Sequence, residues 1–221
     1  MRLSYLHKEC YVVDVVNNEN ATMQDTIDWW WEHHTAREYR LHQEHFTGRI
    51  CDIGCNIGMT TLLAAEDPNV SQVVGVDIFP AAMDAARRYA QFAKLDHKVT
   101  YITQDFTLDC SRLEAGSFDG VVSFHTLEHI YPEDLDAFVL NIRHILKVGG
   151  KVLMCIPHKC AFDSPQHVSY FSEHALRALF VEHGFEVLEL YVTDSGVVDY
   201  AGWETAVLTG LFVKMKGEED A

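Results

Sequence analysis

The feature that most constrains the fold is a repeated order of short apolar runs and helical stretches that begins after Gly48. The apolar runs are rich in β-branched residues, and apolar residues in the stretches between them recur at helical spacing. Repeats of this kind predict a parallel sheet with right-handed crossovers and helices on both faces. The strands are expected at residues 49–53, 72–76, 99–103, 118–124 and 151–156.

The end of the chain completes the expected topology. Two further strands, at residues 185–192 and 205–215, follow each other without a helix between them, which predicts an antiparallel hairpin at one edge of the sheet. The fold class is therefore α/β: a doubly wound, mostly parallel, seven-stranded Rossmann-like sheet with an antiparallel C-terminal hairpin. Helices are expected at residues 59–66, 80–94, 132–146 and 172–183, and a turn at residues 147–150.

The N-terminal part differs in pattern, and we expect residues 1–47 to form a helical lid or extension on a domain of residues 48–221. Residues 11–16 are expected to form a short strand. Residues 22–45 contain no glycine or proline and are expected to form one or two amphipathic helices. The three consecutive tryptophans at 29–31 cannot all face the core, because each helical residue advances by about 100°. One or two are expected to line a pocket; the alternative is packing against the sheet with one ring partly exposed.

The charge balance restricts the partners of the protein. The chain carries 33 acidic and 17 basic residues, a formal net charge of −16, which argues against nucleic acid as a partner. No apolar run approaches the ~18 residues that a membrane span requires, and no charged-then-apolar leader opens the sequence. We therefore expect a soluble, cytoplasmic protein without a membrane partner, whose six cysteines are free thiols. The oligomeric state is left open.

Acidic residues and glycines gather where the predicted strands end. Asp52, Gly54 and Gly58 lie at the end of the first strand, Asp77 ends the second, and Asp105 lies just after the third. Ligands of doubly wound sheets bind at this edge, where glycines let the backbone approach them and the next helix offers its N-terminus. An acid ending the second strand can accept hydrogen bonds from ribose hydroxyls, and one after the third can accept from an adenine amino group. The pattern predicts a nucleotide-like ligand.

Several segments in this order resemble the successive motifs of class I S-adenosylmethionine (SAM)-dependent methyltransferases. The resemblance covers roughly residues 48–192, and the order and spacing of its motifs are specific. Asn56 stands where the family usually has glycine, and asparagine tolerates left-handed backbone angles better than other side chains do. The matching segments are residues 50–58, 74–77, 104–106 and 146–151.

The resemblance implies SAM as the cofactor and assigns roles to the residues at the strand ends. Asp52, Gly54 and Gly58 would hold its methionine moiety, Asp77 its ribose and Asp105 its adenine. The candidate cofactor-binding residues also include Cys55, Asn56, Ile78, Phe106 and His125.

The fourth strand runs into a histidine-rich segment at the edge where a methyl acceptor is expected. Its Glu128-His129 pair resembles one found in both ubiquinone-pathway-like O-methyltransferases and small-RNA 2′-O-methyltransferases, and His167 resembles a later histidine of the RNA enzymes. In metal-using members such residues bind a divalent ion beside the acceptor hydroxyl, which makes Glu128, His129 and His167 candidate metal ligands. His125 replaces the usual first glutamate of that pattern. Two imidazoles and one carboxylate suit Fe, Mn, Ni or Zn better than Mg.

The chemistry leaves more than one role open for this segment. Methyl transfer is an in-line displacement at a sulfonium, so the protein mainly aligns the acceptor and removes its proton. His125, which stands closest to the fourth strand, is the favoured general base, and His129 is the second catalytic candidate. A metal that lowers the pKa of the acceptor hydroxyl is one alternative, and structural support of the loop is the other.

We therefore expect a SAM-dependent methyltransferase that O-methylates a small molecule. The alternatives are N- or carboxyl-methylation, and a catalytically silent methyltransferase-like subunit that binds cofactor or a partner protein. RNA 2′-O-methylation conflicts with the acidic charge, and a nicotinamide dehydrogenase would need glycines that residues 54–58 lack. The acceptor pocket is expected to involve the lid and the loop near residues 194–203, neither of which identifies the acceptor. Tyr39 and Arg40 are candidates to reach the cofactor carboxylate, and His33 and His34 are expected at the surface.

Overall fold

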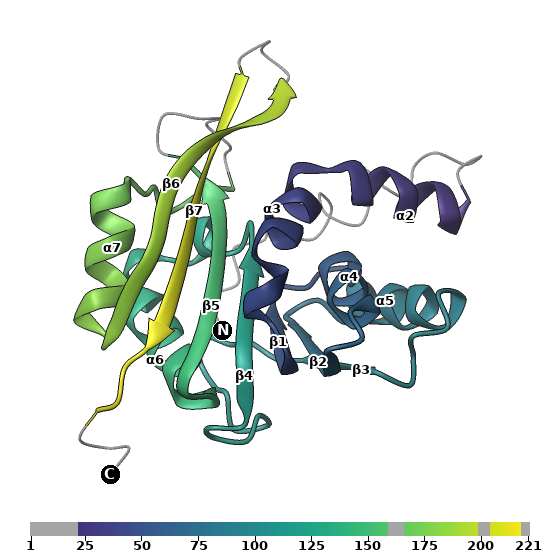
Figure 1. Ribbon diagram of the computed structural model, residues 1–221, viewed down its shortest axis with the longest axis horizontal. Coiled ribbons are helices and arrows are strands. Elements are labelled where there is room, and N and C mark those ends of the chain that lie inside the picture. The colour runs from purple at the N-terminus through teal and green to yellow at the C-terminus, as the bar shows by residue number, and fades with distance from the viewer. Residues whose placement is uncertain (1–21, 159–165, 199–203, 218–221) are drawn as a thin grey trace.

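The computed structural model describes residues 22–158, 166–198 and 204–217 of the chain. This described part folds around one seven-stranded sheet with the strand order β3-β2-β1-β4-β5-β7-β6 (Figure 1). Neighbouring strands are parallel except where β7 runs antiparallel to β5 and β6. The predicted doubly wound α/β fold with a C-terminal hairpin is therefore confirmed. The strands are β1 (Gly48–Ile53), β2 (Val70–Asp77), β3 (Val99–Thr103), β4 (Phe118–Phe124), β5 (Leu146–Pro157), β6 (Phe185–Val198) and β7 (Glu204–Lys214).

Helices lie along both faces of the sheet (Figure 1). They are α2 (Met23–Glu32), α3 (His34–His42), α4 (Met59–Glu66), α5 (Pro80–Phe92), α6 (Leu135–Ile145) and α7 (Glu173–Glu182), with short 3-10 turns η2 (Gln43–His45), η3 (Leu127–His129) and η4 (Pro132–Asp134). Strands present alternate residues to opposite faces. Ile53 of β1 therefore packs in the cluster under α6 and α7, whereas Ile50 of the same strand packs under α3 and α4.

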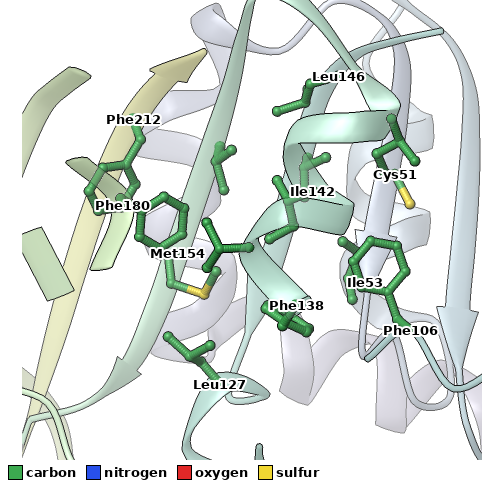
Figure 2. Close-up of a cluster of buried hydrophobic side chains, with 14 of the residues drawn as sticks. Cys51, Ile53, Phe106, Leu127, Phe138, Ile142, Leu146, Met154, Phe180 and Phe212 are labelled. Atoms are coloured by element: carbon green, nitrogen blue, oxygen red, sulfur yellow. The ribbon is translucent and has the colours of Figure 1, made fainter. Parts of the chain in front are cut away.

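A large buried cluster lies between the sheet and helices α6 and α7 (Figure 2). Phe138 and Ile142 of α6 and Phe180 of α7 reach into it, and the Phe180 ring stacks on Phe212 of β7 with centroids 3.9 Å apart. Truncating a buried phenylalanine to alanine costs about 3–5 kcal/mol. This packing therefore fixes the strands whose ends carry the candidate site.

Residues at the helix ends explain where several helices begin and end. Ser172 caps α7, since its hydroxyl accepts a hydrogen bond from the Ala175 N–H at 3.3 Å, and Gly184 follows with a φ of 77°. Pro80 occupies the first turn of α5, as expected from its fixed φ and missing N–H. Thr22 and Asp25 form a capping box at the start of α2. The helices predicted near these signals are confirmed.

The structure differs from the predicted elements at three places. The turn predicted at residues 147–150 belongs to β5, because α6 ends at Ile145 and the chain enters the sheet at once, with an irregular register between Phe118 and Gly120 of β4. The helix predicted from residue 132 begins with the 3-10 turn η4. β6 continues to Val198, beyond the predicted end at residue 192. The strand expected at residues 11–16 lies outside the described residues.

The described part of the segment that we expected to form a lid, here called the lid, consists mainly of α2 and α3, which meet at His33. α3 packs beside β1 and α4 through Ala36 and Tyr39, and α2 extends above α4 and α5 (Figure 1). Ile27 of α2 is buried in a cluster with Ile57 of the segment that follows β1. α2 therefore packs beside the segment that follows β1, where several of the predicted ligand residues lie. Every helix among the described residues is too short or too polar to span a lipid bilayer.

Candidate functional site

The segment after β1 forms a tight turn whose backbone requires its glycines. Gly54, Asn56 and Gly58 have positive φ angles of 76°, 46° and 84°, a region that side chains other than asparagine and aspartate rarely adopt. A Cβ on Gly54 would collide with the side chain of Thr126, and one on Gly58 would lie 2.5 Å from the Tyr101 hydroxyl. The turn therefore depends on glycine twice, and Asn56 keeps the left-handed conformation expected of it.

Asp77 at the end of β2 joins two segments through its carboxylate. One oxygen accepts a hydrogen bond from the Asn56 N–H and the other from the Phe79 N–H, each at 2.9 Å. Burial raises the pKa of the Asp77 carboxyl above its usual value, although bonds from the backbone of Phe79, Asn56 and Ile78 partly offset this. Each carboxylate oxygen has a further lone pair, so the group can still accept hydrogen bonds from a ligand.

Asp52 lies deeper than the other acids. It is 2% exposed, and one oxygen accepts a 2.6 Å hydrogen bond from the Thr61 hydroxyl of α4. Burial raises the pKa of Asp52 to about 7, the Thr61 bonds lower it, and the negative charge of Asp77 raises it again. The carboxyl is therefore poised between its charged and neutral forms beneath the glycine turn.

The third acid and its neighbour also have local roles. Asp105 accepts bonds from the N–H and hydroxyl of Thr107, at 3.1 and 2.7 Å, which closes the turn after β3. Phe106 is buried against Phe138, with the two rings edge-to-face and their centroids 5.5 Å apart, on the face of the sheet that α6 and α7 cover (Figure 2). The Cys55 side chain is buried and Ile78 is half-buried.

The register of the sheet brings these strand ends together. Ile53 of β1 pairs with Val76 of β2, and Asp77 pairs with Thr103 of β3. The Gly54 N–H donates to the Val76 carbonyl, and the Gln104 N–H donates to the Asp77 carbonyl. The residues predicted to bind cofactor therefore lie along one edge of the sheet.

The predicted acceptor side begins where β4 ends. His125 has a left-handed φ of 51°, and its N–H donates to the Cys155 carbonyl of β5 at 2.8 Å. The hydroxyl of the next residue, Thr126, lies 3.2 Å from the Phe124 carbonyl and 3.3 Å from the Ile53 carbonyl, which is directly beside Gly54. The histidine-rich segment is thereby fastened to the glycine turn.

Glu128 is the buried centre of this segment. It is 2% exposed, and its Oε1 lies 3.4 Å from Nδ1 of His125 and 3.9 Å from Nε2 of His129. These contacts are long, and among the described residues neither carboxylate oxygen has a partner at hydrogen-bond geometry. Burial alone would raise the pKa of the Glu128 carboxyl, but its contact with the His125 ring and the charges available on His125 and His129 bring it below the usual value.

The structure brings the third predicted metal ligand to the same place. Ligand atoms of Glu128, His129 and His167 all lie within 4.8 Å of one another, and the two imidazole rings meet edge-to-face at 5.1 Å. The segment carrying His167 is held by backbone bonds, since Val168 and Ser169 both donate to the Glu128 carbonyl. Two segments that are distant in the sequence thus converge on one buried carboxylate.

The lid places an unexpected histidine near this cluster. We expected His33 at the surface, but it is half-buried and stacks on Trp30 with ring centroids 4.9 Å apart. Burial, together with the charge of nearby His125, lowers the pKa of His33 to about 4. No sequence pattern indicates this pairing, because His33 and His125 are distant in the chain and belong to different elements.

The three tryptophans divide between the interior and the solvent. Trp29 is 55% exposed, while Trp30 and Trp31 are half-buried, and their indole N–H groups are buried without a hydrogen-bond partner among the described residues. Tyr39 is buried against Phe46, and the Arg40 guanidinium donates to the Trp31 carbonyl at 2.6 Å. Tyr39 thus packs α3 against the sheet, and Arg40 links α3 to α2.

Comparison with known proteins shows that this chain is similar to methyltransferases. A family model described as a methyltransferase domain matches residues 30–190. The ubiquinone biosynthesis O-methyltransferase of Nitrosococcus oceani is 28% identical over 155 residues, which cover 63% of this chain and 61% of that protein. A protein-lysine N-methyltransferase of Schizosaccharomyces pombe is 29% identical over 140 residues, covering 58% of this chain and 56% of that one. The chain therefore matches only about six-tenths of the length of these curated relatives.

The fold has solved counterparts. A SAM-dependent methyltransferase from Methanosarcina mazei aligns with a TM-score of 0.68 at 18% identity, covering 81% of this chain and 99% of that one. At this identity the likeness concerns the fold alone. The two curated relatives act, by their names, on different acceptor atoms, so similarity leaves the acceptor of this chain open.

Proposed function

This chain belongs to the class I SAM-dependent methyltransferases, and on that premise we propose that it transfers the methyl group of SAM to a hydroxyl of a small molecule, with His125 as the general base. The observation that carries the proposal is the contact between His125 Nδ1 and the buried carboxylate of Glu128, 3.4 Å apart, beside the glycine turn. A carboxylate at one ring nitrogen orients a histidine and favours proton acceptance at the other.

The residues of the first three strand ends would hold the cofactor. Gly54 and Gly58 let the backbone approach its methionine part, with Asp52 beneath the turn, and Asp77 and Asp105 would accept bonds from ribose and adenine. Asn56 supports this assignment, because its Oδ1 is buried and lacks a hydrogen-bond partner among the described residues. The N-terminus of α4, which begins at Met59, adds backbone donors at the same edge.

Bound SAM would supply the methyl group from its sulfonium sulfur. The carbon–sulfur electron pair would stay on that sulfur, so the leaving group is S-adenosylhomocysteine. The acceptor oxygen forms the new bond to the methyl carbon, and its proton passes to Nε2 of His125. Glu128 stabilises the resulting imidazolium from the Nδ1 side. His129 is the alternative base within the same cluster.

A divalent metal at Glu128, His129 and His167 is a second candidate for activating the hydroxyl. The three ligand atoms lie within 4.8 Å of one another, and the Glu128 oxygens are buried without hydrogen bonds among the described residues. Two bonds of about 2.1 Å hold ligand atoms at most ~4.2 Å apart, so a small inward movement of these side chains would suffice. The residues fit such an ion, which would lower the pKa of the acceptor hydroxyl.

We also propose that residues 1–47 act as a lid on the domain of residues 48–221 and help to form the acceptor pocket. Ile27 and Trp30 pack with Ile57 beside the glycine turn, which supports this division of roles. The acidic net charge of −16 favours a small-molecule acceptor over nucleic acid.

Methyl transfer to different acceptors tests the proposal. Protein and SAM carrying a labelled methyl group are incubated with separate pools of phenols and sugars, amines, and carboxylic acids, with and without EDTA. Label in a base-stable ether supports the proposal. Label in an amine or a base-labile ester would replace the proposal with N-methylation or carboxyl-methylation, respectively. In carboxyl-methylation the acceptor is a carboxylate, which needs no general base.

The EDTA arm separates the two ways of activating the hydroxyl. Activity that EDTA removes and one divalent ion restores favours the metal, and unchanged activity favours His125 alone. S-adenosylhomocysteine binding without transfer to any pool would instead indicate a catalytically silent subunit.

A further inference from the structure

A buried carboxylate on the lid helix α3 lies outside the site described so far. Glu38 is 1% exposed, although glutamate is almost never fully buried without partners. Its Oε2 accepts hydrogen bonds from the hydroxyls of Tyr191 on β6, at 2.8 Å, and Thr209 on β7, at 3.2 Å. Its Oε1 has no hydrogen-bond partner among the described residues and lies 3.6 Å from the Arg37 guanidinium. One side chain of α3 thus joins both strands of the C-terminal hairpin.

Neighbouring residues of α3 extend the same contact. The buried His42 ring donates from Nδ1 to the Glu38 carbonyl at 2.8 Å, and its Nε2 lies 3.3 Å from the Tyr191 hydroxyl and 3.5 Å from Glu189. The guanidinium of Arg37 donates to the Asp194 carbonyl of β6 at 3.1 Å. If α3 slid along the hairpin, a buried carboxylate would lose its donors, which is costly. These contacts therefore define one position for the helix.

The network continues to the strand that supports His125. The Thr209 hydroxyl lies 3.9 Å from the Cys155 sulfur, and the Cys155 carbonyl accepts the bond from the His125 N–H. Thr209 is paired in the sheet with Cys155 on one side and Tyr191 on the other. Glu38 and the backbone of His125 are therefore linked through Thr209 and Cys155.

At its other end α3 leads into the part of the lid that packs beside the glycine turn. His33 caps α3, with its ring accepting from the Thr35 N–H at 3.4 Å, and it stacks on Trp30. Trp30 packs in the cluster that contains Ile57 and Met59 of the glycine turn and α4. Any displacement of α3 would therefore move His33 and Trp30 relative to the cofactor turn.

We propose that Glu38 is a positioning residue that, through Tyr191 and Thr209, holds α3 and the adjoining part of the lid closed over the cofactor turn and the His125 segment. Apolar packing of Ala36 and Tyr39 already attaches α3 to the sheet. The buried carboxylate adds a defined position for the helix, a role known for some buried polar groups. The inference rests on the proposed function for what lies beneath the lid, but its test needs no methyl acceptor.

The test measures lid closure directly. A Trp203→Phe background leaves tryptophan only at residues 29–31, so emission reports the lid. In this background, Glu38→Ala, Tyr191→Phe and Glu38→Gln are compared by hydrogen exchange of α3 amides and by the dissociation rate of S-adenosylhomocysteine. Lys214→Met is the matched control, because Lys214 is a buried charge on β7 that donates to the Leu146 carbonyl at the far end of the strand.

We expect Glu38→Ala and Tyr191→Phe to accelerate α3 exchange about tenfold, the effect of losing one or two buried hydrogen bonds, and to speed ligand release several-fold. Glu38→Gln keeps an oxygen for both hydroxyls and should remain within about twofold of the parent. Lys214→Met should lower the melting temperature without changing α3 exchange.

Equal α3 exchange in Glu38→Ala and its parent would overturn the proposal, as would a Lys214→Met variant that loosens α3 equally or a glutamine variant that behaves like alanine. Failure of the proposed function would look different. If the parent transfers no methyl group or binds no S-adenosylhomocysteine, the exchange of α3 still separates these variants.

Discussion

The two sides of the proposed site, one for the cofactor and one for the acceptor, are held together in different ways. On the cofactor side, residues 52–58, 77–79 and 104–107, the carboxylates of Asp77 and Asp105 are fixed mainly by backbone N–H groups of nearby residues. On the acceptor side, residues 125–129 and 166–169 with the lid above them, side chains from separate segments contact one another around Glu128. The first arrangement depends on local backbone shape, and the second depends on the packing of the whole chain.

This difference should separate binding from chemistry. A change on the acceptor side should alter methyl transfer while cofactor binding is kept, and a change on the cofactor side should do the reverse. The Thr126 hydroxyl, 3.3 Å from the Ile53 carbonyl beside Gly54, is a contact between the two sides.

His125→Gln should give the largest effect. Loss of a general base typically costs about 10²–10⁴-fold in rate, and we expect kcat for methyl transfer to fall within that range. S-adenosylhomocysteine affinity, measured by calorimetry, should stay within about twofold of wild type, since we propose that His125 acts as the base and not, as the sequence also allowed, as a cofactor-binding residue. His144→Gln, at an exposed position on α6, is the control. A parallel loss of affinity would mean that the two sides are not separable.

Asp77→Ala should act on the opposite side. Hydrogen bonds to a charged group contribute about 1.5–3 kcal/mol, so removal of this carboxylate should weaken S-adenosylhomocysteine binding by about 10–100-fold in calorimetry. Asp77→Asn keeps an acceptor oxygen but cannot accept from both Asn56 and Phe79 as a carboxylate does, and it should lie between the two. Unchanged affinity in the alanine variant would remove Asp77 from the cofactor site.

The same contrast explains what could be predicted from the sequence. The positions of the strands and helices, the glycine turn and the acids at the strand ends follow from local patterns: β-branched runs, glycines at positions with positive φ and helix caps such as Ser172. Glu128, His129 and His167 were found only through a resemblance between motifs, and the structure brings them together. Glu38 and His33 were missed, because their partners Tyr191 and His125 are distant in sequence and no periodicity encodes such a pairing.

Asp52→Asn sharpens the comparison through stability. Burial raises the Asp52 pKa to about 7 from 3.8, so between these values the folded protein holds a proton that the unfolded chain has released. The free energy of unfolding therefore falls as pH rises through this window. The asparagine variant can keep the Thr61 contact without a charge, and it should melt several degrees higher than wild type at pH 8, with ~2–4 °C for each kcal/mol.

At pH 4 the two proteins should melt together, because the Asp52 carboxyl is then protonated in the folded state. Calorimetric scans without cofactor measure both points. A wild-type protein that is the more stable at pH 8 would show that the buried carboxylate is stabilising in its charged form.

His33→Asn should give the smallest effect, and it probes the acceptor side from the lid. Burial lowers the pKa of His33 to about 4 from 6.5, so the unfolded or open state binds the extra proton first as pH falls between these values. Lid closure should therefore weaken on acidification below pH 6.5, followed as a change in tryptophan emission in the Trp203→Phe background. Asparagine can still cap α3 but does not titrate, so its emission should change less across this range. If both proteins respond equally to acid, the His33 ring is not coupled to closure, and α3 is held by Glu38 and backbone contacts without help from the residue that caps it.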